Sequence, residues 1–246
     1  MALREEIQSQ GAFLFRFRSY LPLIFFLTFI VALFNQLDHL AFRQQTKIWE
    51  LFSLFISIIG LSIRIYTIGH VPKGTSGRNT KKQIAEVLNT TGVYSVIRHP
   101  LYFGNYFMWL GIALFVHSWW LILVFTLAYW MYYERIMYAE EEFLREKFGT
   151  VFIEWARQTP AFVPNFTKWH PSNLTFSWRH VLKREYHGFF AVIASFTILD
   201  IIGDYVIANK FRPDMFWIGM FAGSFLLYLI IRFLALKTRL LQVDGR

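Results

Sequence analysis

Long apolar runs, separated by short polar segments rich in basic residues, make up most of the chain. Six of these runs approach the length of about 20 mostly apolar residues that a helix needs to cross the hydrocarbon core of a bilayer. The pattern predicts an all-α membrane protein with about six transmembrane helices. They lie roughly at 20–36, 48–69, 100–117, 119–138, 187–208 and 215–236.

The third and fourth predicted helices are separated only by His117 and Ser118. A connection this short requires a tight antiparallel hairpin over residues 100–138. No linker long enough to divide soluble domains and no internal repeat is visible, so we expect residues 1–246 to form a single membrane domain.

The composition agrees with a bilayer environment. Hydrophobic residues make up 55% of the chain and charged residues 17%, whereas soluble domains carry about 25% charged residues. The net charge of +9 comes from residues between the apolar runs, which favours headgroup anchors over nucleic-acid binding. The absence of cysteine excludes disulfides, thiolate catalysis and cysteine-ligated zinc, and no histidine or carboxylate pattern suggests another metal site.

Lys and Arg gather before the first run, between the second and third, between the fourth and fifth, and after the sixth. By the positive-inside rule, both termini are then cytoplasmic. The polar segments 70–99 and 139–186 share that side, so two distant parts of the chain can form one site there. The charged N-terminus has no small-residue cleavage site, and we expect no signal peptide.

The first of these segments ends in Arg98-His99, directly before Pro100. Proline suits the first position of a helix, where its missing N–H costs nothing. The positive end of the helix dipole and the free backbone N–H groups would favour an anion near Arg98 and His99. The alternative is that both residues only anchor the helix at the headgroups.

The second segment carries adjacent acids where the fourth helix leaves the membrane. Acidic residues at a helix C-terminus oppose the helix dipole and are not needed for anchoring. Glu140 and Glu141 point about 100° apart, so one can bind a ligand while the other pairs with Arg98, Arg135 or Arg145. The alternative is a solvated acidic face with a pair between Glu141 and Arg145.

Both segments together resemble the isoprenylcysteine carboxyl methyltransferases and phospholipid N-methyltransferases. The resemblance covers about residues 92–164. It is carried by Gly92-Val-Tyr, Arg98-His-Pro-Leu-Tyr-Phe-Gly104, Glu140-Glu141, Leu144, Phe148-Gly149, Phe152, Trp155 and Pro160-Ala-Phe-Val-Pro164. It implies a helical membrane fold that binds S-adenosylmethionine on the cytoplasmic side, between the hairpin and the polar segment after it.

The resemblance implies a set of site residues by position. The cofactor-binding candidates are Tyr94, Arg98, His99, Tyr102, Glu140 and Glu141, and the catalytic candidates are Arg98, Glu141 and Arg145. Carboxylates suit the ammonium and ribose hydroxyls of S-adenosylmethionine, Arg and His suit its carboxylate, and aromatic faces suit its sulfonium. The family usually has tyrosines where this chain has Phe152 and Trp155, so these two receive no polar role.

A basic strip follows the matched region. Arg179, Lys183 and His187 recur at i, i+4, a pattern typical of a helix lying in the interface against anionic lipid. We take Arg179, Lys183 and Arg184 as candidate substrate-binding residues, and the alternative is ordinary anchoring. The chain then divides into N-terminal helices, a methyltransferase core, a basic interfacial segment and a C-terminal helix pair: 1–91, 92–164, 165–186 and 187–246.

Asp200 and Asp204 lie on one face of the fifth predicted helix. Acids inside a membrane are usually paired or functional. We expect them to pair with basic residues near the same membrane surface, namely Arg43, Lys47 or Lys210; an ion path is the alternative.

The leading hypothesis is a membrane methyltransferase that acts on a lipid or lipid-attached acceptor. A lipid phosphate, such as that of lipid A, or another headgroup is favoured by the basic strip over a prenylcysteine carboxylate or a phospholipid amine. We expect the bacterial inner membrane rather than the endoplasmic reticulum. One alternative is an NADPH-dependent sterol or lipid reductase, in which the charged segment tends to be Arg-Asp rather than Glu-Glu. The other is a transporter or channel, suggested only by Asp200 and Asp204.

Overall fold

The structure is a computed structural model that describes residues 2–18, 20, 22–34, 46–72, 85–208, 213–243 and 245. This part of the chain contains eight α-helices and two short 3₁₀ helices, with one isolated β-bridge between Gly92 and His170. The all-α prediction is confirmed. The α-helices are α1 (Leu3–Phe17), α2 (Pro22–Leu33), α4 (Lys47–Gly69), α5 (Pro100–Phe115), α6 (Trp119–Phe148), α7 (Thr150–Gln158), α8 (Trp178–Ala208) and α9 (Met215–Lys237).

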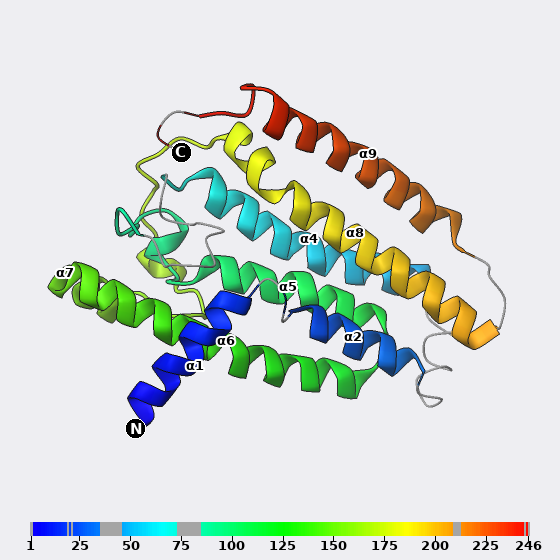
Figure 1. Ribbon diagram of the computed structural model, residues 1–246, viewed down its shortest axis with the longest axis horizontal. Coiled ribbons are helices and arrows are strands. Elements are labelled where there is room, and N and C mark those ends of the chain that lie inside the picture. The colour runs from blue at the N-terminus through cyan, green and yellow to red at the C-terminus, as the bar shows by residue number, and fades with distance from the viewer. Residues whose placement is uncertain are drawn as a thin grey trace.

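Most of the helices lie side by side along one direction, and α1 crosses the far part of α6 (Figure 1). Helix α4 packs against both α5 and α8, and α8 packs against α9. Aromatic side chains fill the core; Phe29, Phe115, Phe196 and Trp217 are fully buried.

Helices α4 and α5 approach closely because small residues face each other. A Cβ atom on Gly60 would overlap the carbonyl of Gly104, and one on Gly111 would overlap Ser57. Small residues of this kind allow helix backbones to touch inside a membrane. The close contact fixes the start of α5 relative to α4.

Three helices in the described part of the chain are long and apolar enough to cross a membrane: α4, α8 and α9. Helix α2 has 12 residues and α5 has 16, while α6 has 30 residues but many Trp and Tyr. The structure therefore supports three crossings by length and composition. The other three crossings stay predictions.

The basic strip differs from the prediction. No separate interfacial helix forms over 165–186, where the only helical element before α8 is a 3₁₀ turn, Phe166–Lys168. Arg179, Lys183 and Arg184 instead form the first turns of α8, which continues without a break to Ala208. No proline interrupts this stretch, and the single glycine beside it, Gly188, is tolerated inside the helix.

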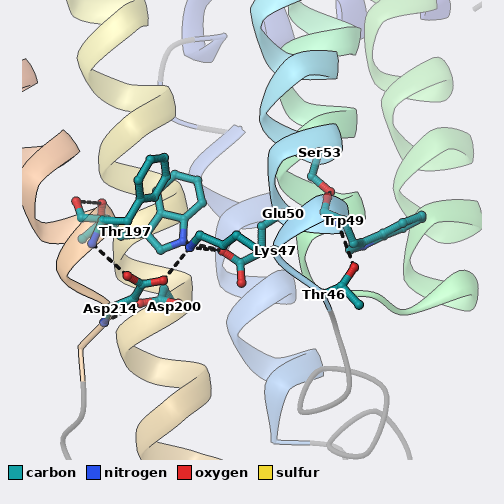
Figure 2. A network of polar contacts seen from close by, with 10 residues as sticks. Thr46, Lys47, Trp49, Glu50, Ser53, Thr197, Asp200 and Asp214 are labelled. Atoms are coloured by element: carbon teal, nitrogen blue, oxygen red, sulfur yellow. Dashed lines mark hydrogen bonds and ion pairs between the residues drawn. The ribbon is translucent and has the colours of Figure 1, made fainter.

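A polar network connects α4, α8 and α9 at the end of the bundle where α4 and α9 begin (Figure 2). Lys47 Nζ donates to Glu50 Oε2 at 2.7 Å and to Asp214 Oδ2 at 2.5 Å, and Trp217 Nε1 donates to Glu50 at 2.8 Å. Asp200 accepts from the backbone N–H of Asp214 at 3.4 Å.

The prediction that Lys47 pairs with Asp200 or Asp204 is therefore wrong. This lysine pairs with Glu50 and Asp214 rather than with Asp200 or Asp204. The other two expected partners, Arg43 and Lys210, lie outside the described residues.

Candidate active site

The two polar segments meet at the end of the bundle where α5 begins. Gly92 has φ 62°, a left-handed conformation that glycine adopts without strain, and it starts a 3₁₀ turn over Val93–Ser95. The backbone N–H groups of Arg98 and His99 then donate to the carbonyls of Pro160 and Ala161, at 2.9 and 3.2 Å. These bonds hold Arg98 and His99 beside the segment that follows α7.

His99 lies between the two adjacent glutamates of α6. Its Nε2 is 3.0 Å from Glu141 Oε1 and its Nδ1 is 3.5 Å from Glu140 Oε2. Burial lowers the pKa of His99, but hydrogen bonds and charge interactions with Glu140 and Glu141 outweigh burial and raise it above its ordinary value. The structure thus favours an imidazolium between two carboxylates.

Arg98 connects Glu141 to the end of α7. Its Nε donates to Glu141 Oε1 at 2.8 Å, and its Nη1 donates to the carbonyls of Ala156 and Thr159 at 2.6 and 2.8 Å. Burial raises the pKa of Glu141, but the bonds from His99 and Arg98 prevail and lower it. The second oxygen of Glu141, Oε2, has no hydrogen-bond partner among the described residues.

Glu140 has a different set of partners. The hydroxyl of Tyr102 donates to its Oε1 at 2.6 Å, and Arg18 Nη1 lies 3.3 Å from the same oxygen. Arg18 comes from the end of α1, so the N-terminal helix reaches the cluster. The sequence interpretation missed Arg18, because the only signal was its place among the basic residues before the first apolar run.

Two more contacts attach α1 to α6. Arg4 forms an ion pair with Glu142 at 2.5 Å, and Gly11 lies directly against the carbonyl of Arg135 and the side chain of Ala139. Helix α1 thus covers the part of α6 that carries the glutamates (Figure 1).

The remaining candidates divide into those near the cluster and those apart from it. The backbone carbonyl of Tyr94 accepts from Trp155 Nε1 at 3.0 Å, while burial and the charge of Glu140 raise the pKa of its phenol. Arg145 pairs with Glu142 at 3.1 Å, one turn back, so the alternative pair between Glu141 and Arg145 is wrong.

The basic residues of α8 do not join the cluster. Arg179 and Lys183 are exposed, and within the described chain neither belongs to an ion pair with a site residue. Arg184 stands on the same first turns of α8.

A buried ion pair lies beneath the cluster. Both oxygens of Glu185 accept from Arg64, each at 2.7 Å, and Arg64 Nη1 donates to Asn105 at 2.7 Å. Two parallel bonds of this kind are the strongest geometry for an arginine and a carboxylate. The pair and its bond to Asn105 connect α4 and α5 to α8. Gly104, which precedes Asn105 in the chain, lies against the side chain of Arg64.

A cleft of about 210 Å³ adjoins the cluster between the end of α6 and α7. Arg98 and Glu141 form part of its wall, and Arg145 and Arg157 add two further cations. In the part of the chain that the structure describes, no group of His, Cys, Asp or Glu is arranged to hold a metal ion. The side chains of the cluster and of the cleft supply carboxylates, guanidinium groups, an imidazole and phenols.

The chain resembles known proteins over part of its length. A model of the phospholipid methyltransferase family matches residues 51–151. The protein-S-isoprenylcysteine O-methyltransferase of Saccharomyces cerevisiae is 28% identical over 135 residues, which are 54% of this chain and 56% of the yeast protein. A probable protein-S-isoprenylcysteine O-methyltransferase of Oryza sativa subsp. indica is 30% identical over 145 residues, 53% of this chain and 72% of the rice protein.

A cobalt-zinc-cadmium resistance protein, CzcN of Cupriavidus metallidurans, is 33% identical over 116 residues, 46% of this chain and 51% of that protein. The chain spans about half the length of the first curated relatives it matches. No solved structure matches significantly.

The helical fold, with three helices long and apolar enough to cross a membrane, and these relatives define the class: membrane proteins whose matched members include named methyltransferases. The chain belongs to the family of isoprenylcysteine carboxyl methyltransferases and phospholipid methyltransferases.

Proposed function

We propose that the protein transfers a methyl group from S-adenosylmethionine to a lipid or lipid-attached acceptor at the cytoplasmic face of the membrane. The observation that carries the proposal is the ordered pair Glu140 and Glu141, held by His99 within a chain of this family. Both termini are cytoplasmic in this proposal, and residues 92–164 form the methyltransferase core of a single membrane domain.

The residues of the cluster fit the methyl donor. Oε2 of Glu141 has no partner within the described chain, and it can accept from an ammonium or a ribose hydroxyl. Nη2 of Arg98 offers a cationic donor for a carboxylate, while His99 orients the two glutamates. The rings of Tyr94 and Tyr102 suit a positive sulfonium. When bound, S-adenosylmethionine supplies a methyl carbon that its sulfonium has already activated.

The protein's own task is then to align the acceptor and exclude water. A phosphate or carboxylate acceptor is already anionic and needs no general base, and Arg98 or Arg145 would position it. An amine acceptor would lose a proton to Glu140 or Glu141.

The favoured acceptor is a lipid phosphate or another anionic headgroup. Arg179, Lys183 and Arg184 on the first turns of α8 would attract it by charge. A prenylcysteine carboxylate and a phospholipid amine come next. This preference for an anionic lipid favours the bacterial inner membrane over the endoplasmic reticulum.

Calorimetry on the purified protein in detergent tests the donor, with S-adenosylmethionine and NADPH as ligands. We expect micromolar binding of S-adenosylmethionine alone, lost in Glu141→Ala and in His99→Ala. Glu146→Ala is the matched control, because this exposed glutamate of the same helix belongs to no ion pair among the described residues.

Transfer of a labelled methyl group into lipid extracts then identifies the acceptor. NADPH binding without S-adenosylmethionine binding would refute the methyltransferase proposal and support the reductase alternative.

A further inference from the structure

The cleft beside Glu141 is lined by three arginines from three separate parts of the chain. Arg98 precedes α5, Arg145 lies in the last turn of α6, and Arg157 lies in the last turn of α7. Glu141 is the acidic residue of the lining, so the wall carries two net positive charges when all four groups are ionised.

The backbone geometry explains how these arginines come together. Gly149 has φ 56°, and this left-handed residue ends α6 and starts α7. Arg98 fixes the far end of α7 through its bonds to the carbonyls of Ala156 and Thr159. The cleft therefore lies between α6 and α7, and α7 is fixed at both ends: by Gly149 at its start and by the bonds from Arg98 at its end.

Several guanidinium N–H donors that line the cleft have no hydrogen-bond partner among the described residues. Arg98 uses Nε and Nη1, and its Nη2 has no partner among the described residues. Arg157 forms no hydrogen bond or ion pair with any described residue. Phe152, which is buried, gives the cleft an apolar side.

The size of the cleft limits what it can hold. Pockets for drug-sized ligands measure about 300–1,000 Å³, and this one measures about 210 Å³. It fits a charged headgroup rather than a whole nucleoside cofactor. Arginines bind planar or tetrahedral oxyanions through paired N–H donors.

We propose that this cleft is a binding site for an oxyanion, with Arg157 as an anion-binding residue. The inference rests on the proposed function for the source of the anion, which is either the phosphate of the lipid acceptor or the carboxylate of the methyl donor. Neither source changes the chemistry of the site, because both present oxygens to guanidinium groups.

The first experiment uses inorganic phosphate as the probe and needs no enzymatic activity. Thermal unfolding of the full chain in detergent is followed with increasing phosphate, against chloride at the same ionic strength. We expect phosphate to raise the unfolding midpoint, and we expect Arg157→Gln to weaken phosphate binding about tenfold, as for the loss of one charged hydrogen bond.

The matched control is Arg239→Gln, an exposed arginine beyond α9 that does not line the cleft. Equal phosphate binding in the wild type and Arg157→Gln, or none in the wild type, would overturn the proposal.

The second experiment separates the two sources in the same variant. A higher KM for the lipid acceptor, with an unchanged Kd for S-adenosylmethionine, assigns the cleft to the acceptor's phosphate. A higher Kd for S-adenosylmethionine assigns it to the donor's carboxylate. If the wild type binds phosphate through Arg157 but neither binds S-adenosylmethionine nor methylates lipid, the proposed function fails and the anion site stands.

Discussion

The imidazole Nε2 of His99 lies 3.0 Å from Oε1 of Glu141, a residue 42 positions further along the chain. This contact joins the residue before α5 to the part of α6 that extends beyond the hairpin. The two pKa shifts that accompany it point in opposite directions: that of His99 is raised and that of Glu141 is lowered. Both shifts favour the charged pair.

These shifts predict how stability depends on pH. The contribution of His99 is complete below its unfolded pKa of 6.5 and is lost as pH rises through its raised folded pKa. The contribution of Glu141 is complete above 4.5 and is lost as pH falls through its lowered folded pKa. We therefore expect maximal stabilisation between these two values and a decline on the alkaline side.

Thermal unfolding of the wild type and His99→Asn, measured in detergent from pH 6 to about pH 9, checks this expectation. The midpoint of the wild type should fall more steeply than that of the variant. His117→Asn is the control, because His117 lies at the hairpin turn and asparagine tolerates its φ of 59°. Parallel curves for His99→Asn and the wild type would contradict the assigned pair.

A second prediction concerns the buried pair of Arg64 and Glu185. Glu185→Ala leaves a buried guanidinium without its carboxylate, and breaking such a pair costs about 3–5 kcal/mol. The double variant Arg64→Met/Glu185→Leu should recover much of this loss, because removing both charges removes the unpaired one. Unfolding by denaturing detergent measures the difference. Arg232→Met on exposed α9 is the control, and a double variant no more stable than Glu185→Ala would refute the argument.

The meeting of the two polar segments could be predicted because a short motif marks each of them. A pair between Arg98 and a glutamate was among the expected alternatives, whereas the contact of His99 with Glu141 was not. Pro100 marks the start of α5, and the adjacent glutamates mark the exit of α6. The positive-inside pattern then placed both segments on one side. Residue type, spacing and topology together were sufficient to expect one shared cluster.

The contacts of Arg18 and Arg157 could not be predicted in the same way. Arg18 reaches Glu140 only because α1 packs across α6, and that packing depends on surface complementarity at Gly11. Arg157 faces the cleft only because α7 turns back at Gly149. Arg145 pairs with Glu142 rather than with Glu141, because Glu141 already binds Arg98 and His99.

The length of α8 shows a related limit. The basic pattern at Arg179 and Lys183 fits an interfacial helix as well as the first turns of a long helix. Gly188 is the one glycine beside the junction at 184–187, and a single glycine inside a helix is tolerated, so neither it nor the charge pattern decides where the helix begins.

A third prediction tests the close contact between α4 and α5. In Gly60→Ala the new methyl group would overlap the Gly104 carbonyl, so the helices must separate. Overpacking of this kind costs about 1–3 kcal/mol. Gly219→Ala on α9 is the matched control, because a Cβ there meets nothing within 4 Å, and alanine favours the helix by about 1 kcal/mol. Equal stability of the two variants, measured by detergent unfolding, would contradict the packing argument.

The last prediction tests whether α1 is held on α6. In Gly11→Val the new side chain would overlap the Arg135 carbonyl and Ala139. Helix α1 should then separate from α6, and Arg18 should lose its contact with Glu140. Trypsin should then cleave after Arg18 at least about tenfold faster, since cleavage follows the population of the open form. Ser9→Val adds the same residue type at an exposed position of α1 and should leave the rate near that of the wild type. Equal rates in both variants would show that α1 does not depend on this contact.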